Sequence, residues 1–292
     1  MRRFLTLIAA LALVLGLGLG GAQQVTLGLS VSTLNNPFFV TLRDGALDAA
    51  RSAGVTLIVL DAQDSPAKQL NDVQDLIQRR VSAILLNPTD AAALVPAVLQ
   101  ANRAGVPVIT VDRAVAGGKV VAHIASDNVA GGRQAAEFIA QRLNGQGSIV
   151  MLEGIPGTSA ARDRGAGFRD GLTKYPGLRL IASQPANFDR AQGLNVMQNI
   201  LQAQPRIDAV FAQNDEMALG AIQAIRTANR TGIMVVGFDA VPDAVAAVAD
   251  GRLAATIAQQ PAKMGQLGVA AAVSYLRGGT VSIPVDLQLV VR

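Results

Sequence analysis

The stretch VTLGLSVSTLNNPFFV, residues 25–40, begins as a β-branched apolar run and continues into two asparagines and two adjacent phenylalanines. From residue 24 onward this succession recurs, because each short β-branched run is followed by a longer amphipathic stretch, such as 66–80 or 131–143. The further strand-like runs occupy residues 55–62, 83–88, 107–113, 148–154, 178–183, 209–214 and 233–239. Strands that alternate with helices predict parallel sheets with helices on both faces. The runs lack a two-residue polar alternation, as expected for strands that are buried on both sides.

The length and the order of the runs predict two domains. A chain of 292 residues can bury a large core and suits two domains. The segment 120–132 leads from a strand into a new helix, and we expect the chain to cross between the domains there first. The segment 255–263 has the same character and predicts a second crossing. The final run, 285–292, follows a segment too short for a third domain, so we expect it to join one of the two sheets.

The first 22 residues have the layout of a secretory signal peptide. Two arginines precede an unbroken apolar run (4–19), and small residues then lead to Ala22, where we expect cleavage. An uncleaved anchor is the alternative, although the apolar run is near the lower length limit for a bilayer span. The glycines of GLGLGG (16–21) have the spacing of a dinucleotide fingerprint. They end the leader instead of joining a strand to a helix, so they predict no bound dinucleotide.

Composition excludes several classes of function. The chain has no cysteine, which removes thiol catalysis, disulfides and a lipid-modified N-terminal cysteine, so we expect a secreted protein that is not lipid-anchored. Lys and Arg total 25 against 21 Asp and Glu, and loss of the two leader arginines leaves 23 against 21. These charges are scattered without a basic run, so no nucleic-acid partner is expected.

Polar or charged residues follow several predicted strands where the chain turns toward the next helix. They are Asn87, Asp112, Arg113, Asn214 and Asp239. In open parallel sheets, ligands bind beyond the carboxyl ends of the strands, so these positions are candidate site residues. Each one alone is equally compatible with a helix cap or a turn. Four such strand ends, spread over both halves of the chain, favour a site between two lobes.

The same residues suit binding better than catalysis. The only histidine, His123, lies in an apolar pattern typical of a structural residue, so a Ser-His-Asp system lacks its base. One histidine without cysteine predicts no metal site, and GTSAARDRG (157–165) contains no nucleophile elbow. Asp accepts from two hydroxyls, Arg donates in a planar fork and Asn does both. With aromatic rings beside them, these groups favour a small polyhydroxylated ring as ligand, and they predict neither an enzyme nor a cofactor.

Several longer motifs carry a resemblance to a known family. STLNNPFFV, LLNPTD, PVITVDR, HIASDN, GTSAARDRG, VFAQNDEMALGA and MVVGFD closely resemble the periplasmic ribose-binding proteins of bacterial ABC sugar uptake systems. The similarity runs from about residue 25 to 291. It implies two Rossmann-like lobes, each a parallel sheet flanked by helices, joined by a three-segment hinge. The implied division is a signal peptide (1–22), an N-terminal lobe (23–126 plus 260–288) and a C-terminal lobe (127–259 plus 289–292), with crossings at the boundaries.

The resemblance implies sugar contacts from both lobes and from the hinge. They are Asn36, Phe38, Phe39, Asn87, Asp112 and Arg113 in the first lobe, Arg164, Phe188, Asn214 and Asp239 in the second, and Gln259 at the hinge. The aromatic rings would enclose the sugar ring, while the charged and amide groups accept from and donate to its hydroxyls. At Phe188 the family admits another aromatic residue, which keeps the stacking face. For the adjacent phenylalanines, a hydrophobic staple at a helix start is the alternative.

The implied function is capture of D-ribose between closing lobes in the periplasm and its delivery to the permease of an ABC transporter. The resemblance implies a monomer without a cofactor, and a chemoreceptor stays open as a further partner. Another monosaccharide, such as allose, galactose, xylose or a furanose-like signal, is the alternative within the same class. Two alternatives from other classes fit the sequence poorly. A sugar-responsive transcription regulator would begin with a helix-turn-helix, whereas this sequence begins with a predicted signal peptide. An enzyme of Rossmann type would need a phosphate loop, and the glycine motif that resembles one lies in the leader.

Overall fold

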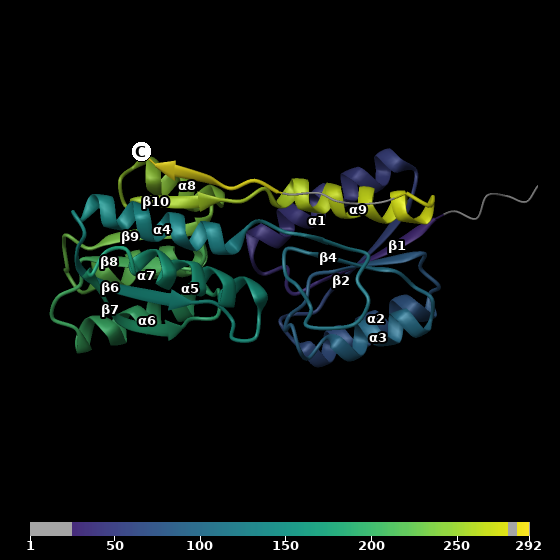
Figure 1. Ribbon diagram of the computed structural model, residues 1–292, viewed down its shortest axis with the longest axis horizontal. Coiled ribbons are helices and arrows are strands. Elements are labelled where there is room, and N and C mark those ends of the chain that lie inside the picture. The colour runs from purple at the N-terminus through teal and green to yellow at the C-terminus, as the bar shows by residue number, and fades with distance from the viewer. Residues whose placement is uncertain (1–24, 280–284, 292) are drawn as a thin grey trace, which may run out of the picture.

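The chain folds into two α/β lobes that lie side by side along the long axis of the molecule (Figure 1). The computed structural model describes residues 25–279 and 285–291, and the predicted signal peptide lies outside them. The strands of the first sheet are β1 (Thr26–Val31), β2 (Thr56–Asp61), β3 (Ala83–Leu86), β4 (Val108–Val111) and β5 (Ala122–Ile124). The strands of the second sheet are β6 (Gln146–Glu153), β7 (Gly177–Pro185), β8 (Ala209–Ala212), β9 (Met234–Asp239), β10 (Ala255–Ala258) and β11 (Gln288–Val291). The helices are α1 (Pro37–Ala53), α2 (Pro66–Gln78), α3 (Val95–Arg103), α4 (Asn128–Arg142), α5 (Ser159–Leu172), α6 (Arg190–Ala203), α7 (Asp215–Thr227), α8 (Pro242–Ala249) and α9 (Pro261–Leu276). None of these helices in the described ranges has the length and apolarity that a membrane crossing would need.

Both sheets are essentially parallel, as the alternation of runs predicts. The first has the order β2-β1-β3-β4-β5 and the second the order β11-β10-β9-β8-β6-β7. Among the described strand pairs, only β10 and β11 run antiparallel. The central strands β3, β4 and β8 are buried along their whole length, which explains their uninterrupted apolar sequences. The predicted fold class is therefore confirmed.

The stretch 25–40 forms the first strand-to-helix connection of the first lobe. Asn36 caps α1, because its side-chain oxygen accepts a hydrogen bond of 2.9 Å from the backbone N–H of Phe38. Pro37 occupies the first turn, where its missing N–H costs nothing. The helix ends at Gly54, whose φ of 68° is in the left-handed region. This cap sets both phenylalanines in the first turn of α1, at the carboxyl edge of the sheet.

Helices within each lobe pack with their backbones in contact. A Cβ added at Gly45 of α1 would overlap the carbonyl oxygen of Ala262 in α9, and one at Gly265 of α9 would overlap that of Leu42. The same holds for Gly132 of α4 against α5. Figure 1 shows α9, from the end of the chain, lying along α1 from its beginning. The first lobe is therefore built from two distant parts of the chain.

The chain passes between the sheets in three places. It leaves β5 of the first sheet and enters α4, which packs against α5 of the second lobe. It returns between β10 and α9, and it crosses last before β11. Ser126 and Val285 form an isolated parallel bridge, so the first and last crossings lie side by side. Gln288 already pairs with Ala258 of the second sheet, so the last crossing comes before residue 288 and not at 288–289.

Candidate functional site

A small cavity lies between the two lobes. It is narrow, because the side chains of the two lobes approach each other closely around it. Its walls are Asn36, Phe38, Phe39, Asp112, Arg113, Ala160, Arg164, Phe188, Asn214, Asp239 and Gln259. The structure thus brings together all the predicted contact residues except Asn87, and it adds Ala160 from the first turn of α5.

The first-lobe wall is built on the end of β4. Asp112 follows this strand with a positive φ of 62°, and it is 3% exposed, like Arg113 beside it. Asn87 lies behind Asp112, because its Nδ2 donates to the Val111 carbonyl (3.1 Å) and to Asp112 Oδ2 (3.3 Å). Its own oxygen accepts from the hydroxyl of Ser32 at 2.7 Å. Asn87 therefore holds Asp112 in place from outside the cavity wall.

The second-lobe wall centres on Arg164, which α5 presents to the cavity. Its Nε donates to Asn128 Oδ1 (2.8 Å) and its Nη1 donates to the carbonyl of Gln213 (2.7 Å). The guanidinium carbon lies 3.9 Å from the ring centroid of Phe238, within cation–π range. Nη1 is also 3.5 Å from Asp239 Oδ1, at ion-pair distance. These contacts fix the direction of the guanidinium before any ligand is bound.

Asp239, at the end of β9, is the acidic residue that the second lobe contributes to the cavity wall. Gln259 Nε2 donates to its Oδ1 at 2.7 Å. Burial raises the pKa of Asp239 to about 7, and the nearby charge of Arg164 opposes this shift. Its φ is 117°, and that of the next residue, Ala240, is 57°. Both aspartates that face the cavity thus follow a strand on positive-φ backbone.

Three aromatic rings close the cavity. The Phe38 and Phe39 rings meet edge to face, with centroids 5.1 Å apart and planes at 87°. The Arg113 guanidinium lies 5.0 Å from the Phe39 centroid and 5.3 Å from that of Phe188, which comes from the other lobe. Asn214 Nδ2 donates to the Phe188 carbonyl at 3.1 Å and so holds the turn that carries this ring. Both members of the adjacent pair line the cavity, although they also belong to the core.

Several buried polar atoms on the cavity residues have no hydrogen-bond partner within the described part of the chain. They are Asp112 Oδ1, Arg113 Nε and Nη1, and Gln259 Oε1. Leaving such an atom unpaired costs about 1–3 kcal/mol, so these atoms favour a ligand that donates to two acceptors and accepts from one guanidinium. Burial also raises the pKa of Asp112 and lowers that of Arg113, and the attraction between the two groups opposes both shifts. Two arginines and two aspartates line the cavity together, so it offers both donors and acceptors to a polar ligand.

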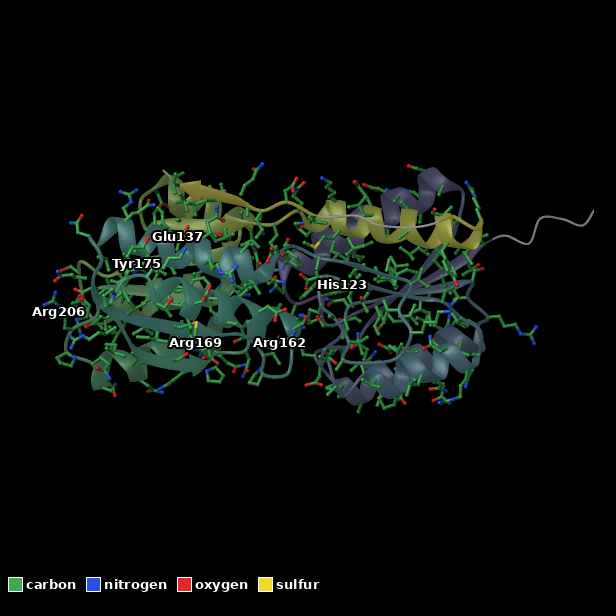
Figure 2. The ribbon with its side chains drawn as sticks, viewed as in Figure 1. His123, Glu137, Arg162, Arg169, Tyr175 and Arg206 are labelled. Atoms are coloured by element: carbon green, nitrogen blue, oxygen red, sulfur yellow. The ribbon has the colours of Figure 1, made fainter. Side chains whose placement is uncertain are left out.

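His123 does not line the cavity and has a local partner. Its Nδ1 lies 2.9 Å from the hydroxyl of Thr110, and Figure 2 shows it on the first lobe near the junction. Burial lowers its pKa. Among residues 25–279 and 285–291, no three His, Asp or Glu side chains are grouped to hold a metal ion.

Comparison with known proteins identifies the family. The sequence profile described as "Periplasmic binding protein domain" matches residues 27–280. The chain belongs to this family. As a periplasmic binding protein, it is 51% identical over 294 residues to the ribose import binding protein RbsB of Escherichia coli K12, covering 100% of this chain and 99% of that protein. It is 49% identical over 273 residues to RbsB of Bacillus subtilis 168, covering 92% and 88% of the two chains.

Solved structures of other periplasmic binding proteins share the fold. An ABC transporter solute-binding protein of Bacillus halodurans C-125 with bound myo-inositol has a TM-score of 0.89 at 33% identity, covering 93% of this chain and 96% of that one. One from Actinobacillus succinogenes 130z with bound D-allose has a TM-score of 0.85 at 33% identity, covering 92% and 98%. Because these ligands differ, the fold of a periplasmic binding protein does not by itself select the ligand.

Two further residues position Arg164 in this periplasmic binding protein, and the sequence patterns predict neither of them. Asn128 follows the first crossing, and Gln213 follows β8 directly before Asn214. Gln213 could have been found, because it is a polar residue at a strand end like the others. Asn128 is the first residue of α4, where an asparagine reads as an ordinary helix start. Only the packing of α4 against α5 brings it to Arg164.

Proposed function

We propose that this periplasmic binding protein captures D-ribose between its lobes and delivers it to the membrane permease of an ABC sugar transporter. The proposal rests on the buried atoms of Asp112, Arg113 and Gln259 that have no hydrogen-bond partner within the described part of the chain, in a cavity between the lobes. Sugar hydroxyls would donate to the two acceptors and accept from the guanidinium, because a hydroxyl does both. The phenylalanine rings would cover the apolar faces of the sugar ring.

Similarity favours ribose over other small sugars. The relatives named for ribose import share about half of their residues with this chain, whereas those with bound inositol or allose share 33%. Another monosaccharide, such as allose, galactose, xylose or a furanose-like signal, is the second candidate. This second candidate is supported by the solved relatives, which have the same fold and carry other ligands.

Ligand binding would be coupled to closure of the two lobes. Hinge closure around a ligand is the motion known for periplasmic binding proteins. A buried atom that has no partner costs about 1–3 kcal/mol, so a sugar that pairs with these atoms would favour closure. Because the contacts come from both lobes, a sugar that satisfies them stabilises only the closed state, which the permease can then recognise. Capture at low concentration requires binding of about −8 kcal/mol, or a micromolar Kd, and involves no reaction.

We also propose how the protein reaches the periplasm and which partners it meets there. The leader would be removed after Ala22, and the mature chain would act as a monomer in the periplasm without a lipid anchor. Its main partner would be the permease, and a chemoreceptor is a further candidate partner for the closed form.

Calorimetric titration of residues 23–292 tests the proposal. The protein is first unfolded and refolded to remove bound ligand, and then titrated with ribose, allose, galactose, glucose, xylose and arabinose. We expect one-to-one binding of ribose, well ahead of the other sugars. Preferential binding of another sugar would leave the transport role standing and refute ribose. Absence of binding to every sugar would refute the proposed function.

A further inference from the structure

Asp215 is a fully buried carboxylate that lies behind the cavity wall. It is the first residue of α7, it is 0% exposed, and it is not among the residues that line the cavity. Its Oδ2 accepts a hydrogen bond of 2.9 Å from the backbone N–H of Val241. Its Oδ1 accepts one of 2.7 Å from the hydroxyl of Thr256 in β10. One carboxylate thus links α7, the turn after β9, and the neighbouring strand β10.

The turn that Asp215 holds carries Asp239. Both Asp239 (φ 117°) and Ala240 (φ 57°) have positive φ, which side-chain-bearing residues adopt only where other contacts enforce it. The Ala240 N–H donates to Thr256 Oγ1 at 3.2 Å, and the same hydroxyl donates to Asp215. The backbone N–H groups of both residues after Asp239 are therefore tied, directly or through one hydroxyl, to Asp215.

Strand β9 also leaves no room for the carboxylate to move. A Cβ added at Gly237 would overlap Asp215 Oδ1, so this strand packs directly against the carboxylate. Burial, followed by the charge of Asp239, raises the pKa of Asp215 well above its usual range. A buried acid so close to another acid is costly, and its hydrogen bonds to the turn offset that cost.

The first lobe contains a comparable arrangement. Asp112 has a φ of 62° at the end of β4, and the amide of Asn87 donates to its carboxylate and to the carbonyl before it. In each lobe, a strand-end aspartate on positive-φ backbone is thus held by a second polar side chain outside the cavity wall.

From these contacts we infer that Asp215 is a positioning residue for sugar binding, which fixes the turn 239–241 so that the Asp239 carboxylate points at the ligand. The inference rests on the proposed function. Asp215 touches no ligand on this account, and it acts entirely through Asp239. Its loss should therefore weaken binding only while Asp239 is present to be positioned.

A double-mutant cycle separates this role from a general role in folding. The variants are Asp215→Ala, Asp239→Ala and the double variant, with ribose affinity measured by calorimetry. Alanine is chosen because asparagine would mimic a protonated acid and keep an acceptor oxygen. Asp72→Asn is the matched control, since Asp72 is also a buried acid (6% exposed), is paired with Lys68 at 2.9 Å and is not among the residues that line the cavity.

We expect Asp215→Ala to raise the ribose Kd at least tenfold, and to raise it less than threefold when Asp239 is already alanine. Hydrogen exchange at the Val241 amide should accelerate in Asp215→Ala and stay unchanged in Asp72→Asn. If Asp215→Ala does not fold, Thr256→Val, which removes the bridging hydroxyl, should raise the Kd about threefold or more in the wild-type background only. A Kd unchanged in the folded variants, or raised equally in both backgrounds, overturns the inference. Failure of the wild-type protein to bind any sugar would instead overturn the proposed function.

Discussion

Replacement of Arg164 by methionine tests the binding site most directly. Methionine keeps the length and apolar character of the side chain, but it removes the guanidinium that donates to Asn128 and Gln213 and pairs with Asp239. The side chain of Arg164 is only 4% exposed, so water cannot replace the lost charge. Asp239 would keep Gln259 as its remaining described hydrogen-bond partner.

The structure sets the size of the expected effect. Truncation of one member of a buried, hydrogen-bonded charge pair costs about 2–5 kcal/mol in binding. At about 1.4 kcal/mol for each factor of ten, the ribose Kd should rise about 30-fold to several thousand-fold. Breaking a buried ion pair costs about 3–5 kcal/mol of unfolding free energy. We expect the lower end here, because the pKa of Asp239 is already raised to about 7 and the acid can take up a proton.

Arg169→Met on the same helix is the control. Arg169 lies in the body of the second lobe (Figure 2), its side chain is 50% exposed, and it pairs with Glu153. Exposed pairs of this kind contribute about 0–1 kcal/mol, so this variant should bind ribose like the wild type. Calorimetry gives the Kd of each variant, and denaturant titration gives its stability. If Arg164→Met bound ribose within threefold of wild type, the assignment of Arg164 to the binding site would be wrong.

Three further predictions concern stability, packing and the aromatic wall. Because burial raises the pKa of Asp239 to about 7, against the opposing charge of Arg164, its contribution to sugar-free stability is present below about pH 4 and is lost as the pH rises through 7. Between pH 5 and 8, the unfolding free energy of Asp239→Asn, measured by denaturant titration at each pH, should thus change less than that of the wild type. An equal change with pH in both proteins would contradict this. Gly45→Ala should lower the unfolding free energy by about 1–3 kcal/mol, since the added Cβ meets the Ala262 carbonyl. The ribose Kd should stay within twofold of wild type. An unchanged midpoint of thermal unfolding would show that α1 and α9 can move apart without cost. Phe188→Ala should raise the ribose Kd about tenfold or more in calorimetry, because a ring that is 8% exposed and covers the cavity is lost, and an unchanged Kd would mean that this ring does not contact the sugar.

The sequence was sufficient for the fold class and for part of the site. Parallel strands buried on both faces give apolar runs, so strands such as β3 and β8 could be recognised from composition alone. The polar residues after strands identified Asp112 and Asp239, because the carboxyl ends of parallel strands meet at one edge. Arg164 and Phe188 came only from the family resemblance, since one lies on a helix and the other in a turn.

The remaining details depend on packing that no local pattern encodes. Asn87 occupies a strand end just as Asp112 does, but its amide turns toward Ser32 and Val111 and away from the cavity. Asp215 reads as an ordinary acidic residue at a helix start, where an aspartate is favourable for the helix dipole. Its bonds to Val241 and Thr256 join residues 26 and 41 positions apart, which sequence periodicity cannot reveal.

The packing of α9 against α1 has a consequence for the order in which the molecule can be completed. The ribosome makes the first sheet before the second, but the helix that covers α1 around Gly45 is made only after β10 of the second sheet. The edge strand β11 of the other lobe emerges later still. A nascent chain that ends at residue 258 would therefore hold two unfinished lobes, each with an uncovered apolar surface. Such a chain should remain open to proteases and chaperones until α9 and β11 have been made.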